Sequence, residues 1–113
     1  MNTELNKAIT ILAALEEYVS KVQEESNTKF QTQYPNSWAN GQAPIFSINE
    51  GKRYFKVISR YPGNGGGSAF CFIDRATGDI FKPAGYNAPA KGARGNILND
   101  KLPLTGGSMY RYR

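Results

Sequence analysis

The sequence predicts a small α+β protein, in which an N-terminal amphipathic helix packs on an antiparallel β-meander and an irregular C-terminal segment follows. Apolar residues recur every three or four positions near the start of the chain, which is the spacing of one helix face. Further along, short alternating or apolar runs lie between glycine, proline and aspartate residues, as in strands joined by turns. With 113 residues, of which 40% are hydrophobic, the chain (1–113) is expected to form a single domain around one modest core.

The helix is expected at residues 3–25. Thr3 suits the N-cap, because its hydroxyl can accept a hydrogen bond from a free N–H of the first turn. One apolar stripe runs along the helix and consists of Leu5, Ala8, Ile9, Leu12, Leu15, Val19 and Val22. Such a stripe favours a helix that covers a sheet, and its partial seven-residue repeat leaves a helix-mediated dimer as the alternative. The polar residues 26–29 are expected to end the helix.

An aromatic region at residues 30–50 follows, and it is expected to be a loop or an irregular strand pair. Pro35, Gly41 and Pro44 interrupt every regular pattern there. Trp38 is expected to plug the edge of the core, and stacking on a base or sugar is the alternative role of its ring.

The β-meander is expected within residues 52–83. Its three strands are predicted at 52–61, 68–74 and 79–83. Alternation in the first strand places Phe55 on one face and Lys56 on the other. The second strand is a short apolar run, which is typical of a central position in a sheet.

Two glycine-containing segments are expected to connect these strands. Asp74 and Gly78 bound a tight turn, in which the aspartate opens the turn and the glycine takes a left-handed conformation. The run PGNGGGS at 62–68 lies between two strands with no helix after it, so it lacks the pattern of a phosphate-binding loop. We expect a flexible hairpin connection there, with a flap over a ligand or an anion-binding nest as the alternative.

The composition argues against an enzyme. The chain has no histidine, so the commonest general base and the commonest metal ligand are missing. The one cysteine, Cys71, lies in an expected strand, so it is interpreted as a core residue that suits a reducing cytoplasm. We therefore expect no catalytic residue, no metal and no cofactor. No apolar run approaches the ~18 residues of a membrane-spanning helix, so no membrane partner is expected.

Positive charge is concentrated in the later three quarters of the chain. Residues 1–28 contain two lysines and five glutamates, whereas residues 29–113 contain twelve basic and four acidic residues. A surface with this bias attracts phosphates or acidic partners, and ordinary solubility is the alternative reason for it.

The basic segment at residues 84–98 is the most informative part of the sequence. Its prolines and glycines restrict or permit specific backbone angles, so the segment is expected to have a defined shape. A short helical turn near 88–98, starting at Pro89, would place Lys91 and Arg94 on one side. Lysine and arginine together recur around phosphate and carboxylate groups.

We interpret this region as a binding site for a phosphate-bearing ligand. The candidate ligand-binding residues are Lys82, Tyr86, Lys91, Arg94, Asn96 and Trp38. The cations would bind phosphates, the amide would add hydrogen bonds, and an aromatic ring would stack on a base. Alternatively, Arg94 pairs with Asp74 or Asp79, and the lysines are solvated.

The stretch FCFIDRATGDIFKPAGYNAPAKGARGNIL resembles a block in small proteins encoded by tailed bacteriophages. In that block a strand ends in a TGD-type turn, followed by an aliphatic residue, an aromatic residue, Lys, Pro-Ala and an APAK…R.N segment. The resemblance covers residues 68–98. The matching positions are Thr77, Gly78, Asp79, Lys82, Pro83, Ala84, Pro89, Ala90, Lys91, Arg94 and Asn96. The resemblance implies a viral setting and supplies no activity.

These features predict a non-enzymatic phage accessory protein that binds a nucleotide or a nucleic acid. The nucleotide could be a host-defence signalling nucleotide, and the expected location is the host cytoplasm. The alternative is a virion or protein-interaction component. It would assemble as a homo-oligomer through its helix, its strand edges and the tail 99–113, which is expected to be an edge strand or a mobile arm.

Overall fold

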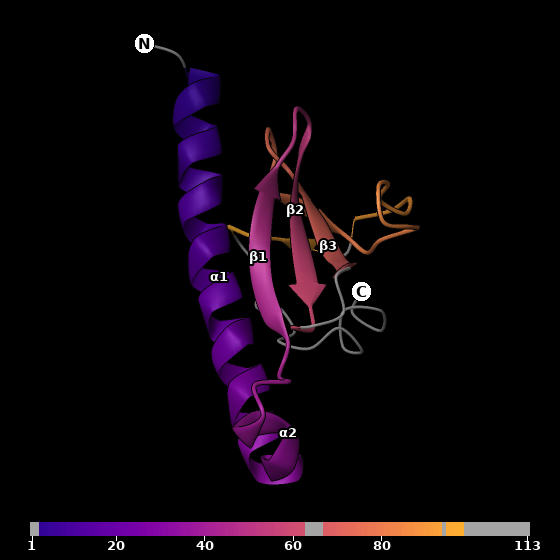
Figure 1. Ribbon diagram of the computed structural model, residues 1–113. Coiled ribbons are helices and arrows are strands. Elements are labelled where there is room, and N and C mark those ends of the chain that lie inside the picture. The colour runs from indigo at the N-terminus through magenta and orange to yellow at the C-terminus, as the bar shows by residue number, and fades with distance from the viewer. Residues whose placement is uncertain (1–2, 63–66, 94, 99–113) are drawn as a thin grey trace.

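A long helix, α1 (Thr3–Gln33), lies against a five-stranded antiparallel sheet in the computed structural model (Figure 1). The structure describes residues 3–62, 67–93 and 95–98. The remaining elements are α2 (Pro35–Ala39), β1 (Ile45–Glu50), β2 (Tyr54–Arg60), β3 (Gly67–Asp74), β4 (Asp79–Phe81) and β5 (Gly95–Asn96). The strands lie side by side in chain order, each antiparallel to its neighbour. The predicted fold class, a helix packed on an antiparallel meander, is confirmed.

The core lies between α1 and one face of the sheet. Its most deeply buried side chains come from both layers and are Ile11, Leu15, Val22, Phe55, Val57, Cys71, Ile73 and Ile80. Each large apolar side chain buried in this way stabilises the fold by about 1.5–3 kcal/mol relative to leaving it exposed. The sheet therefore covers most of the predicted apolar stripe of α1. The placement of Ile9 in that stripe is wrong, because its side chain is 58% exposed.

The helix α1 continues to Gln33, beyond the end predicted at residue 25. Residues 26–33 lack the apolar stripe but contain neither glycine nor proline, so nothing in them stops a helix. Pro35 then opens α2, because proline fits the first turn of a helix, where no N–H is needed. In the described part of the chain, no helix is both long enough and apolar enough to cross a membrane.

The prediction of a loop or irregular strand pair at residues 30–50 is wrong. The end of α1 and the whole of α2 occupy the first part of this region. The strand β1 forms a regular ladder with β2, from the pair Ile45 and Arg60 to the pair Glu50 and Phe55. Pro35 begins α2, and Gly41 and Pro44 lie between α2 and β1, so none of them interrupts an element, which the sequence pattern does not reveal.

The predicted three-stranded meander is confirmed as β2, β3 and β4, and β1 and β5 extend it at its edges. The turn between β3 and β4 takes the predicted form. Asp74 Oδ1 accepts hydrogen bonds from the N–H groups of Ala76 at 2.7 Å and Thr77 at 3.2 Å. Gly78 has a φ of 83°, a left-handed conformation that glycine adopts without steric cost.

The predicted helical turn near residues 88–98 is wrong for the described part of that segment. The chain folds back on itself there, with an isolated β-bridge between Pro83 and Pro89. The Ala90 N–H donates to the Lys82 carbonyl oxygen at 2.8 Å, so cross-chain hydrogen bonds replace helical ones. Gly92 has a φ of 90°, which a right-handed helix does not allow.

Candidate functional site

The sheet face opposite α1, here called the helix-free face, has an aromatic and cationic cluster. Its members alternate along the strands with the core residues and are Tyr54, Lys56, Phe72 and Phe81. The Tyr54 ring meets the Phe72 ring and the Phe81 ring edge-on, with ring centroids 6.0 Å apart in each pair. Phe72 retains only 3% exposure. The packed rings of Tyr54, Phe72 and Phe81 are here called the aromatic floor, and Lys56 lies beside it.

Residues 82–90 lie beside this face, and Lys56 contacts them directly. Figure 1 shows this orange part of the chain on the side of the sheet away from α1. Lys56 Nζ donates to the Tyr86 carbonyl oxygen at 3.0 Å and to Asn87 Oδ1 at 3.5 Å. The same nitrogen lies 3.7 Å from the centroid of the Tyr86 ring and 6.0 Å from that of Phe72. The ring quadrupole attracts a cation in this position, so one ammonium group joins β2 to the basic segment.

The charge of Lys56 has no acidic partner in the part of the chain that the structure describes. Neither Lys56 nor Lys91 forms an ion pair with a described carboxylate. The carboxylates of Asp74 and Asp79 form hydrogen bonds to other groups. Asp74 accepts from a backbone N–H in the β3–β4 turn, and Asp79 Oδ1 accepts from Asn96 Nδ2 at 3.1 Å. Lys56 and Lys91 therefore keep their positive charges without a direct ion-pair partner among the described residues.

Asn96, a predicted ligand-binding residue, has its side-chain amide engaged within the chain. Besides its bond to Asp79, Nδ2 donates to the Thr77 carbonyl oxygen at 2.8 Å. Its Oδ1 accepts a hydrogen bond from the Leu98 N–H at 2.9 Å. These contacts hold β5 against the β3–β4 turn, so the structure gives Asn96 a positioning role.

The four other predicted site residues that the structure describes lie in two places. Lys82, Tyr86 and Lys91 lie together in the folded-back segment, where Lys82 is half-buried and the other two are exposed. Trp38 lies on α2, at the opposite end of the molecule from the N-terminus of α1 and apart from the basic segment (Figure 1). It is 37% exposed and belongs neither to the core cluster nor to the side chains packed against it, so the prediction that it plugs the edge of the core is wrong. Arg94 lies outside the described residues, as does its alternative pairing with an aspartate.

Lys56 is the contact residue that sequence reasoning does not select. Its local signal is weak, because a lysine on the outward face of an alternating strand is ordinary. Its partner Tyr86 lies 30 residues further along the chain, and no local pattern links the two positions. The usable signal is the alternation along the strand, which places Lys56 and Tyr54 together on the face that the helix does not cover.

Two titratable groups lie in the core and not at this face. Cys71 is fully buried, which confirms its predicted core position, and burial raises the pKa of its thiol. Burial also raises the pKa of the Tyr18 hydroxyl, with a smaller contribution from Cys71. Both groups are therefore uncharged near neutral pH, and a buried thiol is a poor nucleophile. Among the residues that the structure describes, no three Cys, Asp or Glu side chains gather as a metal site.

Comparison with known proteins places the chain in one family. Neither a curated protein nor a solved structure matches it. A family model, described as a family of unknown function, matches residues 1–105. Because this match takes in α1, the whole sheet and the basic segment, the chain belongs to that family, DUF7717.

Proposed function

We propose that this protein binds a phosphate-bearing ligand on its helix-free face and performs no catalysis. The observation that supports the proposal most directly is the Lys56 ammonium group, which lies over the Tyr86 ring and pairs with no described carboxylate. A cation that neighbouring groups hold in place, without an opposite charge nearby, attracts an external anion. Phosphate is the anion that lysine and arginine commonly bind together.

The shape of the region favours a strand of nucleic acid as the ligand. An open hollow of about 290 Å³ lies between the start of β3 and residues 83–86. Lys56 lies over the exposed Tyr86 ring, and Lys82, Lys91 and Arg94 are the further predicted phosphate contacts. An extended strand can place successive phosphates on separate cations while a base stacks on tyrosine, whereas a mononucleotide needs an enclosed pocket.

The resemblance of residues 68–98 to phage proteins extends this proposal to a biological setting. A phage accessory protein in the host cytoplasm would meet viral or host nucleic acid, and also signalling nucleotides of host defence. Both ligand types present phosphates beside a base, which is the chemistry that the helix-free face fits.

Fluorescence anisotropy with a labelled single-stranded oligothymidylate tests the proposal. We expect Lys91→Ala and Arg94→Ala each to weaken binding by ~1–3 kcal/mol, the scale of a lost charged hydrogen bond. Lys7→Ala is the matched control, because Lys7 is exposed on α1, on the other side of the sheet. Equal affinities for the parent chain and all three variants would overturn the proposal.

Salt dependence distinguishes a polymer from a mononucleotide. For a single strand, log K is expected to fall with log salt by about 0.7 for each phosphate that a cation contacts. Mass spectrometry of small molecules released from the purified, heat-denatured protein provides the second readout. A released mononucleotide together with a shallow salt slope would show that the polymer is the wrong ligand.

A further inference from the structure

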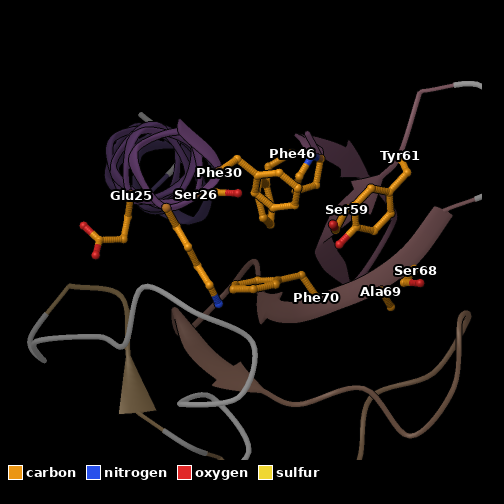
Figure 2. Close-up of a pocket in the computed structure, with 11 residues that line it drawn as sticks. Glu25, Ser26, Phe30, Phe46, Ser59, Tyr61, Ser68, Ala69 and Phe70 are labelled. Atoms are coloured by element: carbon orange, nitrogen blue, oxygen red, sulfur yellow. The ribbon is translucent and has the colours of Figure 1, made fainter. Parts of the chain in front are cut away.

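A cavity of about 340 Å³ lies on the other side of the sheet, between the later half of α1 and the adjacent ends of β1, β2 and β3 (Figure 2). Aromatic side chains from three elements form its walls, and Figure 2 shows Phe46, Tyr61 and Phe70 around the same space. The Phe46 and Phe70 rings pack edge-to-face, with centroids 5.3 Å apart and an interplanar angle of 84°. None of the predicted ligand-binding residues lines this cavity.

Two local features of the sequence open this space. Ser59 of β2 and Ser68 of β3 are paired across the ladder, and their small side chains leave room beneath α1. The register between β2 and β3 shifts beside Val57, which leaves Phe70 unpaired in the ladder. Phe70 and Cys71 consequently both join the core cluster, and Phe70 becomes a wall of the cavity.

The polar groups at the cavity set the charge that a ligand should have. Lys29 lines it, and in the described part of the chain its ammonium group pairs with no carboxylate. Glu25 is also at the rim, but Figure 2 shows its carboxylate turned away from the space. Ser26 and Ser59 add hydroxyl groups that can donate to an oxygen anion. The cavity therefore combines aromatic walls with hydrogen-bond donors and the Lys29 ammonium group, which pairs with no described carboxylate.

We infer that this cavity is a second ligand site, which takes one small, planar aromatic molecule with a carboxylate or sulfonate group. The flat ring would lie against the wall that Phe46 and Phe70 form together, because aromatic rings prefer edge-to-face or offset contacts. The anionic group would lie at Lys29. The volume is at the lower end of the ~300–1,000 Å³ of small-molecule pockets, so it suits one such molecule and not a helix. The site is independent of the helix-free face.

The test uses two fluorescent probes that differ in charge. Anilinonaphthalene sulfonate is an aromatic anion, and N-phenyl-1-naphthylamine is its neutral counterpart. We expect saturable binding of one anionic probe per chain, with a rise in fluorescence as the ring leaves water. Ser59→Phe should abolish this binding, because the new ring fills the space between the aromatic walls.

The charge of Lys29 is tested separately. We expect Lys29→Gln to weaken binding of the anionic probe by about ten-fold, the scale of a lost charged contact, and to leave the neutral probe unaffected. Lys7→Gln is the matched control on the same helix, because Lys7 is exposed and does not line the cavity. Equal weakening of both probes would show that Lys29 acts through packing and would overturn its assigned role.

The folding of Ser59→Phe and the location of the bound probe complete the test. Ser59→Phe should keep the cooperative thermal transition and the oligonucleotide affinity of the parent chain. If Ser59→Phe does not fold, amide shifts of Phe30, Ser59 and Phe70 in the parent chain on adding probe locate the site directly. Undiminished probe binding by a folded Ser59→Phe, shifts confined to other residues, or no saturable binding would each overturn the inference.

Discussion

At the residue scale, Gln23 shows how α1 protects the edge of the sheet. Its Nε2 donates to the Pro44 carbonyl oxygen at 3.0 Å and to Asn27 Oδ1 at 3.0 Å, while its Oε1 accepts from the Phe46 N–H at 2.8 Å. The side chain thus pairs with the backbone at the start of β1, which is an edge strand. Unpaired edge groups are a template for pairing with another chain, so this contact discourages assembly through that part of the edge.

Gln23→Ala is expected to lower the free energy of unfolding by about 1–3 kcal/mol, because it leaves half-buried backbone groups without partners. Urea denaturation monitored by circular dichroism measures the change. Gln31→Ala is the matched control, since Gln31 is exposed on the same helix. Equal stability of the two variants would show that water replaces the amide without cost.

The buried thiol gives the stability a dependence on alkaline pH. Burial raises the pKa of Cys71 in the folded state, so above the unfolded pKa of about 8.5 the unfolded chain loses a proton that the folded chain keeps. The unfolding free energy is therefore unaffected by this group below that pH and falls above it, by at most ~1.4 kcal/mol per pH unit. Burial acts on Tyr18 in the same direction from about pH 10.

Cys71→Ala is expected to delay this decline until tyrosine ionises near pH ~10. Denaturant titrations at a series of pH values between neutral and alkaline compare the variant with the parent chain. If the unfolding free energy began to fall at the same pH in both chains, ionisation of the Cys71 thiol would not be the cause of the decline.

At the scale of elements, local signals decide what the sequence predicts. The β3–β4 hairpin was predictable, because Asp74 and Gly78 have distinct backbone roles at fixed positions. The end of α1 was not, because residues 26–33 have no apolar periodicity and only the absence of a helix breaker permits a helix there. In the basic segment, Pro89 suggested the start of a helix, whereas its bridge to Pro83 depends on a pairing that no local pattern contains.

Gly78→Ala tests the hairpin. A methyl group there would lie 3.2 Å from Ile97 Cγ2 and 3.3 Å from Asn96 Oδ1, and the φ of 83° is strained for alanine. We expect a loss of about 1–3 kcal/mol in the free energy of unfolding.

Gly85→Ala is the matched control for this substitution. A methyl group at Gly85 would have no atom within 4 Å, and the residue has no positive φ. It should leave stability unchanged or raise it slightly, because alanine restricts the unfolded chain. Thermal unfolding measures both variants, and equal melting temperatures would show that the turn tolerates a side chain.

At the scale of the whole molecule, the sheet separates two chemically different sides. One side packs against α1 and contains the aromatic cavity, and the other has Lys56, the aromatic floor and the basic segment. The sequence predicted two of these parts. The apolar periodicity of the helix and of the strands indicated the helix-covered core, and the basic segment is one continuous stretch. It predicted neither the cavity nor the contact of Lys56 with Tyr86, because both form between residues far apart in sequence.

Lys56→Met tests whether the two sides are independent. Methionine keeps an unbranched apolar stem against Phe72 and Tyr86 but removes the charge. We expect weaker oligonucleotide binding, with a salt slope reduced by about 0.7 for a lost phosphate contact. Probe binding in the cavity should not change.

Lys52→Met is the matched control, because Lys52 is exposed in the turn between β1 and β2. Anisotropy titrations at several salt concentrations compare the two variants. Identical slopes would mean that Lys56 contacts no phosphate.

The position of Trp38 has a practical consequence for anyone who follows this protein by its intrinsic emission. The chain has a single tryptophan, and that indole lies on α2, half in water and outside the core. Its emission therefore reports the docking of one short helix, while far-ultraviolet dichroism reports the long helix and the strands. A mismatch between the two melting curves would reveal local fraying of α2 before global unfolding.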